Sequence, residues 1–210
     1  MINILIVDDH IIVREGLRRI IEETNEIKVG AEASTGKEAL KIIHQEKFDL
    51  VLLDISMPKK NGLQTLKEIR KYDKKLPILM LSMHAEEQYA MRAMKAGAAG
   101  YLTKDSAPSM LVGAIRKIHK GRKFISSEVA ELLVTEIYHN EDKQIHETLS
   151  DREFEIFKLI VRGDSSKIIA DNLGISDKTV STYRSRVMKK MDMQSTSDLI
   201  HYAIENNISD

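Results

Sequence analysis

Four short runs of apolar residues occur in the first half of the chain, and each leads into polar residues with useful chemistry. The runs are residues 4–7 before Asp8 and Asp9, 50–53 before Asp54, 78–81 before Ser82, and 100–103 before Lys104. Because successive side chains of a strand point to opposite faces, an unbroken apolar run is typical of a strand buried on both faces of a parallel sheet. The sequence therefore predicts buried parallel strands at these four places.

Helical periodicity alternates with these runs through about residue 120. Apolar residues recur at helical spacing over 10–21, 36–43, 61–70, 86–96 and 106–119, and a weaker strand is expected over 28–33. Five strands that alternate with five helices imply βαβ units with right-handed crossovers. We therefore expect an α/β fold with a doubly wound, five-stranded parallel sheet that is covered by helices on both faces.

The pattern changes after Gly121. One more helix is expected over 126–138, and the polar residues of 139–148 are typical of a linker. From Leu149 onward only helical signals remain, beginning with a capping box at 150–153 and including a longer helix that Ser176 caps. We therefore expect three segments: an α/β domain at 1–121, a linker with a helix at 122–147, and a small all-α domain at 148–210.

The composition excludes several classes of protein. Of the 210 residues, 42% are hydrophobic and 30% are charged, so the chain can bury an ordinary core. It contains no cysteine, which excludes disulfides, thiolate metal sites and cysteine catalysis and fits a cytoplasmic protein. No apolar stretch reaches the roughly 18 residues that span a bilayer, and no signal peptide is expected. The formal net charge is zero, so the whole chain lacks the electrostatic signature of a nucleic-acid binder.

The polar residues that follow the strands predict a site for a divalent cation and a phosphoryl group. Ligands gather at the carboxyl ends of parallel strands, so three carboxylates, a hydroxyl and an ammonium are expected to converge there. A hard cation such as Mg²⁺ (or Mn²⁺) relieves the repulsion between the carboxylates. Lys104 and Ser82 can then contact phosphate oxygens, and Asp54 can attack phosphorus to form an acyl phosphate. A single aspartate at a strand end is usually a helix cap, but four matched strand ends favour a site.

Residues 1–120 resemble the receiver domain of bacterial two-component response regulators. The chain departs from many receivers in carrying Asp105, where they have a proline after the lysine. The matching features are Asp8, Asp9, Asp54, Met57, Pro58, Gly62, Ser82, the run from Gly97 to Tyr101, and Lys104.

The resemblance implies roles for these residues. Asp54 would accept a phosphoryl group from a histidine kinase. The metal would be held by Asp9, Asp54 and the backbone carbonyl of Ser56, with Asp8 acting through water. Ser82 and Tyr101 would form a switch pair with Lys104 nearby: the hydroxyl moves toward the phosphoryl group and the ring turns inward.

The helices after residue 149 suit a helix-turn-helix, in which the second helix lies in the DNA major groove. In the helix at 176–191, Val180, Tyr183, Val187 and Met191 share one face and are expected to pack inward. The opposite face is polar, and 178–190 holds five basic residues and no acidic one. However, 148–210 contains nine Lys and Arg residues against ten Asp and Glu, so one copy should bind DNA weakly and a homodimer should bind better.

This segment resembles the LuxR-type helix-turn-helix, and the order of the two domains resembles the NarL/FixJ class of response regulators. The matching motifs are 149–153, Gly163, 167–170, 173–176, 178–180 and 189–191, with Ile168 standing where that family often has glutamate. The last helix, at 197–205, would be a dimer surface. The residues implied to contact bases are Ser181, Thr182 and Ser185, and those implied to contact phosphates are Lys167, Lys178, Thr179, Tyr183, Arg184 and Lys189.

The interpretation is a phosphorylation-controlled transcription regulator that is not an enzyme, with DNA and a sensor histidine kinase as partners. One alternative is a receiver whose helical domain binds protein. The other is a Mg²⁺-dependent phosphohydrolase, although such enzymes usually carry an Asp-x-Asp motif on the first strand, whereas here the two aspartates are adjacent.

Overall fold

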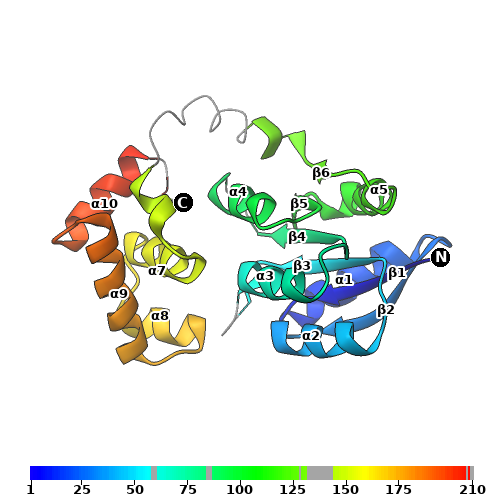
Figure 1. The fold of residues 1–210 in the computed structure, drawn as a ribbon, viewed down its shortest axis with the longest axis horizontal. Coiled ribbons are helices and arrows are strands. Elements are labelled where there is room, and N and C mark those ends of the chain that lie inside the picture. The colour runs from blue at the N-terminus through cyan, green and yellow to red at the C-terminus, as the bar shows by residue number, and fades with distance from the viewer. Residues whose placement is uncertain (58–60, 84–86, 128, 132–143, 207, 209–210) are drawn as a thin grey trace. The chain divides into compact units, whose positions relative to one another are not determined.

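The computed structural model describes residues 1–57, 61–83, 87–127, 129–131, 144–206 and 208. The chain divides into two compact units, Met1–Tyr138 and His139–Asp210, which are described separately below (Figure 1). Most of the helix expected over 126–138 and residues 139–143 of the linker expected over 139–148 lie outside the described residues. The end of that linker is not irregular, because Ile145–Thr148 forms a 3₁₀ helix. None of the helices in the described part of the chain is long and apolar enough to cross a membrane.

The first unit is built on a parallel sheet with the strand order β2-β1-β3-β4-β5-β6. The strands are β1 Ile2–Val7, β2 Ile27–Ala33, β3 Leu50–Asp54, β4 Ile78–Ser82, β5 Gly100–Thr103 and β6 Phe124–Ile125. Among the described residues the sheet has six strands, so the expectation of five was wrong. The sixth strand consists of only two residues at the sheet edge, which is too short to produce a periodic pattern in the sequence.

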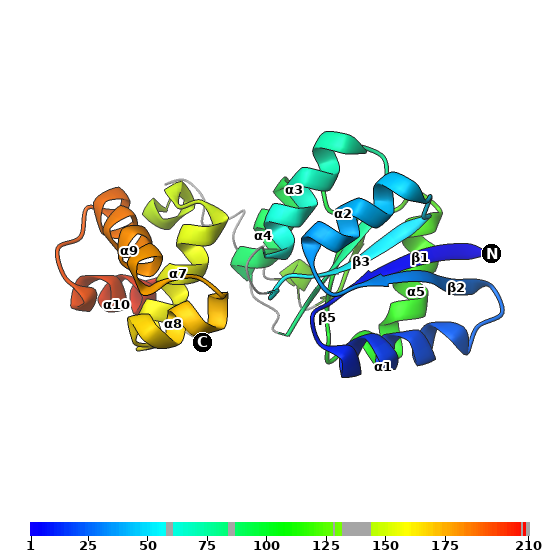
Figure 2. The same ribbon diagram turned by 90° about the horizontal axis from the view of Figure 1, so that it is seen from below.

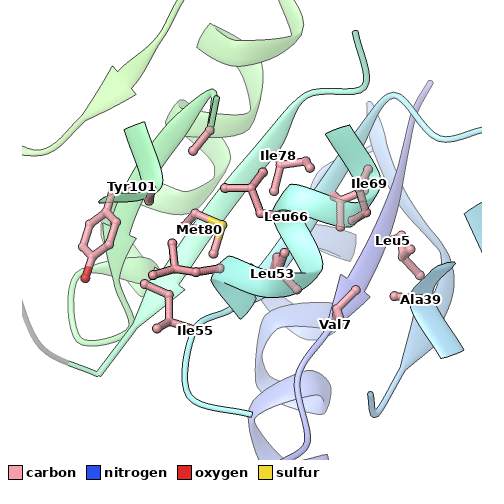
Figure 3. Close-up of a cluster of buried hydrophobic side chains, with 14 of the residues drawn as sticks. Leu5, Val7, Ala39, Leu53, Ile55, Leu66, Ile69, Ile78, Met80 and Tyr101 are labelled. Atoms are coloured by element: carbon pink, nitrogen blue, oxygen red, sulfur yellow. The ribbon is translucent and has the colours of Figure 1, made fainter. Parts of the chain in front are cut away.

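Helices cover both faces of this sheet. They are α1 Ile11–Glu22, α2 Gly36–Gln45, α3 Gly62–Tyr72, α4 Glu87–Lys95 and α5 Ala107–His119. Leu5 and Val7 of β1 pack with α2, α3 and α4 in one core (Figure 3). Ile4 and Ile6 of the same strand pack with α1 and α5 on the opposite face. Figure 2 shows α1 and α2 on opposite sides of the sheet. Because both faces are covered, β1, β3, β4 and β5 each carry an unbroken run of apolar residues.

The start of α3 is pressed against the end of β3. Asn61 caps the helix by accepting a hydrogen bond from the backbone N–H of Gln64 at 3.0 Å. A Cβ atom on the next residue, Gly62, would lie 2.0 Å from the backbone carbonyl oxygen of Asp54. Only glycine allows this close approach, which fixes the chain just behind the Asp54 side chain.

The second unit is helical. Its elements are the 3₁₀ helix η1 Ile145–Thr148 and the α-helices α7 Asp151–Val161, α8 Ser166–Leu173, α9 Asp177–Met191 and α10 Thr196–Glu205. The turn between α8 and α9 contains Gly174, whose φ of 59° is favourable for glycine. Phe154 and Phe157 of α7, Val180 and Val187 of α9, and Leu199 of α10 are fully buried. The helix packing therefore leaves the opposite face of α9 exposed.

Candidate functional site

Strand pairing brings the ends of β1 and β3 together. Val7 is the register partner of Leu53, so Asp8 and Asp54 follow at adjacent positions, and both side chains are fully buried. Asp9 comes next in the chain, and its side chain is 24% exposed. Carboxylate oxygens of these three residues and a ring nitrogen of His10 all lie within 4.8 Å of one another. The tertiary structure therefore gathers the acidic residues into one cluster.

Lys104 is positioned by the loop that follows β5. Its ammonium lies 2.7 Å from Oδ2 of Asp8 and 2.9 Å from Oδ1 of Asp54, and its side chain is 8% exposed. Its backbone N–H donates to the carbonyl of Ser82 at 2.7 Å. The hydroxyl groups of Thr103 and Ser106, which flank Lys104 and Asp105 in the chain, are 2.6 Å apart and form a hydrogen bond across this loop. The peptide bond to Asp105 is trans, because no described residue has a cis bond.

The charges in this cluster perturb one another. Burial raises the pKa of Asp54 to about 6, and although the charge of Lys104 opposes the shift, the charge of Asp8 adds to it. Burial disfavours the charged form of Lys104, but the charge of Asp54 and the hydrogen bonds to Asp8 and Asp54 outweigh it and raise the pKa of Lys104. The ammonium therefore remains charged and compensates carboxylates that would otherwise repel each other.

The donor set of the cluster fits a hard divalent cation. Such ions take carboxylate and carbonyl oxygens as ligands. The cluster supplies carboxylate oxygens from Asp8, Asp9 and Asp54 that lie within 4.8 Å of one another. Oδ2 of Asp54 is buried and has no hydrogen-bond partner of regular geometry among the described residues. A backbone hydrogen bond from Ser56 lowers the pKa of this carboxyl without cancelling the effect of its burial. A buried carboxylate with so few partners is costly, and a bound cation would satisfy it.

The remaining predicted residues of the receiver site lie near the ends of the central strands. Ser82 ends β4, opposite Thr103 in the register with β5, and is 4% exposed. Tyr101 lies on β5 and is completely buried in this structure (Figure 3). Ser56 lies two residues beyond the end of β3 and is exposed. Pro58, which belongs to the receiver motif, lies outside the described residues.

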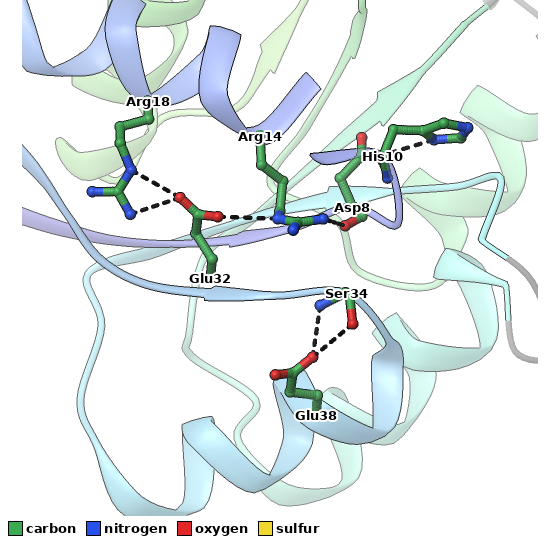
Figure 4. Close-up of polar contacts among 7 residues, drawn as sticks. All are labelled: Asp8, His10, Arg14, Arg18, Glu32, Ser34 and Glu38. Atoms are coloured by element: carbon green, nitrogen blue, oxygen red, sulfur yellow. Dashed lines mark hydrogen bonds and ion pairs between the residues drawn. The ribbon is translucent and has the colours of Figure 1, made fainter. Parts of the chain in front are cut away.

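His10 is a residue of this site that sequence reasoning missed. Its backbone N–H donates to Oδ1 of Asp8 at 2.8 Å, and its Nδ1 lies 3.3 Å from the same oxygen (Figure 4). The Nδ1 atom also lies 3.1 Å from Oδ1 of Asp9. The sequence suggested that His10 begins the first helix. Its position directly after the two aspartates was the only available signal.

The predicted DNA-contacting residues lie mostly on the exposed side of α8 and α9. Val180, Val187 and Met191 are buried on the opposite side of α9, as the periodicity predicts, whereas Tyr183 and Thr179 are half-buried. The hydroxyl groups of Thr182 and Ser185 donate to backbone carbonyls one turn earlier in α9. The exposed members of the predicted set are Lys167, Lys178, Ser181, Thr182, Arg184, Ser185 and Lys189.

Two basic residues of α9 bond within the helical unit. Lys190 lies 2.6 Å from the buried carboxylate of Glu153, which also completes the capping box of α7. Arg184, a predicted phosphate contact, donates from Nη2 to the hydroxyl of Thr196 at the start of α10. Lys190 therefore ties the end of α9 to the start of α7, so it is a structural residue as well as part of the basic run.

Comparison with known proteins assigns each of the two units to a family. Residues 4–116 match the family described as the response regulator receiver domain, and residues 147–203 match the family of bacterial regulatory proteins of the luxR type. The chain belongs to the response regulators. It is a regulator of transcription of the NarL/FixJ class, in which phosphorylation controls DNA binding.

Relatives of this response regulator match it over nearly its full length. Response regulator UvrY of Escherichia coli (strain K12) is 38% identical over 99% of this chain and 96% of its own. Response regulator GacA of Pseudomonas protegens is 33% identical over 100% of this chain and 99% of its own. A structure of the Salmonella typhimurium RcsB response regulator matches with a TM-score of 0.61 at 27% identity, covering 96% of this chain and 97% of that one. RcsB in complex with DNA gives 0.61 at 26% identity and covers 96% of each chain.

Proposed function

We propose that Asp54 is the phosphoacceptor through which a sensor histidine kinase controls this response regulator. The observation that supports this role is the placement of its buried carboxylate at the end of a central strand, 2.9 Å from the ammonium of Lys104. An oxygen of Asp54 would attack the phosphorus of a phosphohistidine, so that a P–O bond forms as the P–N bond breaks.

Asp9, Asp54 and the backbone carbonyl of Ser56 would hold Mg²⁺ or Mn²⁺ in this reaction. When bound there, the cation would neutralise charge on the phosphoryl oxygens. Asp8 would act through water, a role consistent with its side chain, which already accepts from the backbone N–H of His10 and pairs with Lys104. Lys104 would contact a phosphoryl oxygen and compensate its charge.

Ser82 and Tyr101 would report phosphorylation to the surface of the receiver. Ser82 is at the carboxyl end of β4, and its hydroxyl would move toward the phosphoryl group and donate a hydrogen bond to it. The ring of Tyr101, on the neighbouring strand, would then be held in the inward position that it has in this structure. Added charge at Asp54 would thereby favour one of two receiver conformations.

The helical domain would bind DNA as a homodimer through α9. Ser181, Thr182 and Ser185 would face bases, and the residues proposed to contact phosphates are Lys167, Lys178, Thr179, Tyr183, Arg184 and Lys189. RcsB has been solved as dimers bound to DNA, which supports this mode. We take the functional segments to be 1–121, 122–147 and 148–210, with action in the cytoplasm, where the DNA is, and no enzymatic turnover of its own.

The test is DNA binding measured by fluorescence anisotropy with and without acetyl phosphate and Mg²⁺. The probe is a labelled duplex selected from random-sequence DNA by the phosphorylated protein. Phosphorylation should raise the affinity by about 5- to 150-fold, the usual range for coupling between two sites. An Asp54→Asn protein should not respond, whereas Asp105→Asn, which removes an exposed carboxylate nearby, should respond like the unchanged protein. Equal responses from both variants would refute gating through Asp54.

A further inference from the structure

Arg14 of α1 connects three elements next to the acidic cluster. Its Nη1 donates to the backbone carbonyl oxygen of Asp8 at 2.8 Å, and its Nε donates to Oε2 of Glu32 on β2 at 3.0 Å (Figure 4). Its side chain is only 13% exposed. The planar guanidinium holds its donors in a fixed geometry, so a helix, a strand and the turn after β1 are held in one arrangement.

The carbonyl that Arg14 contacts belongs to the peptide bond between Asp8 and Asp9. A peptide unit is planar, so fixing its carbonyl fixes the plane from which the next residue departs. The other side of Asp8 is also held, because its backbone N–H donates to the carbonyl of Ala33 at 3.1 Å. The backbone around Asp8 is therefore anchored to β2 directly and, through Arg14, to Glu32 on the same strand.

Asp9 depends on this backbone more than the other two carboxylates do. Asp8 and Asp54 are fully buried and are paired with Lys104. The Asp9 side chain is partly exposed, and its contact within the described cluster is with His10, whose own side chain is 63% exposed. Solvent and an exposed histidine do not hold a carboxylate rigidly. The direction of the Asp9 carboxylate is therefore set chiefly by the backbone that precedes it.

Arg18 offers a contrast on the same helix. Its Nε and Nη2 donate to Oε1 of Glu32 at 2.8 and 2.6 Å, and it also pairs with Glu22. Arg14 and Arg18 therefore share Glu32, but only Arg14 is bonded to the Asp8 carbonyl. If Arg14 served only to join α1 to β2, the two arginines would be equivalent.

We infer that Arg14 is a positioning residue that orients the Asp8–Asp9 peptide, and through it the Asp9 carboxylate, for binding a divalent cation. The inference rests on the proposed role of this cluster as a metal site. Partners of this kind, which hold a ligand without touching the metal, commonly affect metal affinity by 10- to 100-fold. Arg14 should thus set how tightly the cation binds and leave the reactivity of Asp54 in the loaded site unchanged.

The decisive comparison is between Arg14→Met and Arg18→Met in the full-length chain. Methionine keeps much of the apolar stem of arginine and removes the donors, so packing against β2 is largely preserved. Mn²⁺ affinity is measured from the free-ion electron paramagnetic resonance signal, and Mg²⁺ affinity by calorimetry. Arg14→Met should weaken both by about tenfold, and Arg18→Met by less than about twofold, because it leaves the Asp8 carbonyl bonded.

The rate of phosphorylation by acetyl phosphate separates positioning from a general loss of structure. Arg14→Met should require a higher Mg²⁺ concentration for half-maximal rate but reach the maximal rate of the unchanged protein. Arg14→Lys should recover part of the lost affinity, because an ammonium can donate to the carbonyl but cannot span both partners as a fork. Equal metal affinity in the two methionine variants, or a lower maximal rate in Arg14→Met alone, would overturn the inference.

A readout in the metal-free protein distinguishes this inference from the proposed function. The amide resonance of Asp9 senses hydrogen bonding to the Asp8 carbonyl, so it should shift in Arg14→Met and stay in place in Arg18→Met. If the unchanged protein bound no cation, the proposed metal site would fail, while the Asp9 resonance would still test the orienting role of Arg14. An unshifted Asp9 resonance in Arg14→Met would overturn that role.

Discussion

At the scale of single residues, Asp54 is held in an environment that disfavours its charged form. Burial raises its pKa to about 6, from an ordinary value of 3.8. A carboxyl group whose pKa is raised by folding contributes stability below its unfolded-state pKa, and that contribution is lost as pH rises through the folded-state value. Above pH 6 the ionised carboxylate of Asp54 therefore lowers the free energy of unfolding by about 3 kcal/mol, at 1.36 kcal/mol per pKa unit.

This cost predicts that Asp54→Asn stabilises the metal-free protein in a pH-dependent way. With a chelator present at pH 7.5, the variant should unfold at a higher urea concentration than the unchanged protein. Its free energy of unfolding should be higher by about 1–3 kcal/mol. The gain should shrink toward pH 5, where Asp54 of the unchanged protein is protonated. Urea titrations at the two pH values measure it.

The control for this prediction is Asp105→Asn, since Asp105 is exposed. It should change stability little at either pH, because an exposed carboxylate keeps its hydration. A gain for Asp54→Asn that is the same at both pH values would contradict the argument from its pKa.

At the scale of elements, α9 carries two kinds of basic residue. Lys178 and Lys189 are exposed near its two ends. Lys190 is next to Lys189 in the sequence but lies 2.6 Å from the carboxylate of Glu153 and contacts the carbonyl of Thr148. The same side-chain chemistry therefore has different roles on this helix, depending on which way each residue points.

This difference predicts distinct salt dependences of DNA binding. Each phosphate contact contributes about one unit to the slope of log affinity against log salt concentration. Lys178→Ala and Lys189→Ala should each reduce that slope by about one in anisotropy titrations of the phosphorylated protein. Salt-insensitive binding by the unchanged protein would favour a protein partner for this domain.

Lys190→Ala serves as the matched control on the same helix. It should leave the salt slope almost unchanged but lower the stability of the helical unit, because Glu153 is 5% exposed and would lose its charged partner. A fall of about one in the slope for this variant would show that Lys190 contacts DNA phosphate.

At the scale of the whole molecule, the net charge is zero and the helical segment 148–210 is slightly acidic, so overall charge does not draw the protein to DNA. Binding must depend on the local charge of α9. Linking two such sites makes the second contact intramolecular, which raises the overall affinity without any new contact. This is the physical reason to expect control through dimerisation.

The corresponding prediction is that phosphorylation converts monomers into dimers, so that the molecular mass measured in solution doubles. Sedimentation equilibrium with acetyl phosphate and Mg²⁺ should show dimers for the unchanged chain and for Asp105→Asn. Asp54→Asn should remain at the monomer mass under the same conditions. DNA affinity that rises on phosphorylation while the mass stays that of a monomer would exclude dimerisation as the cause.

The sequence by itself determined the alternation of strands and helices, the inward face of α9, and the residue types at the ends of the strands. These properties follow from periodicity and local chemistry, so no distant contact is needed to read them. The same local nature explains the error over the sixth strand: Phe124 and Ile125 carry too short a pattern, and only pairing with β5 makes them a strand.

Only the tertiary structure decided which polar groups share the site and how they are held. His10 lies beside Asp8 and Asp9, and Arg14 reaches both the Asp8 carbonyl and Glu32. Lys190 is committed to Glu153, a residue 37 positions away. Such pairings depend on the packing of elements that are distant in the chain, and side chains of the same type can take different partners. Their geometry therefore had to come from the fold.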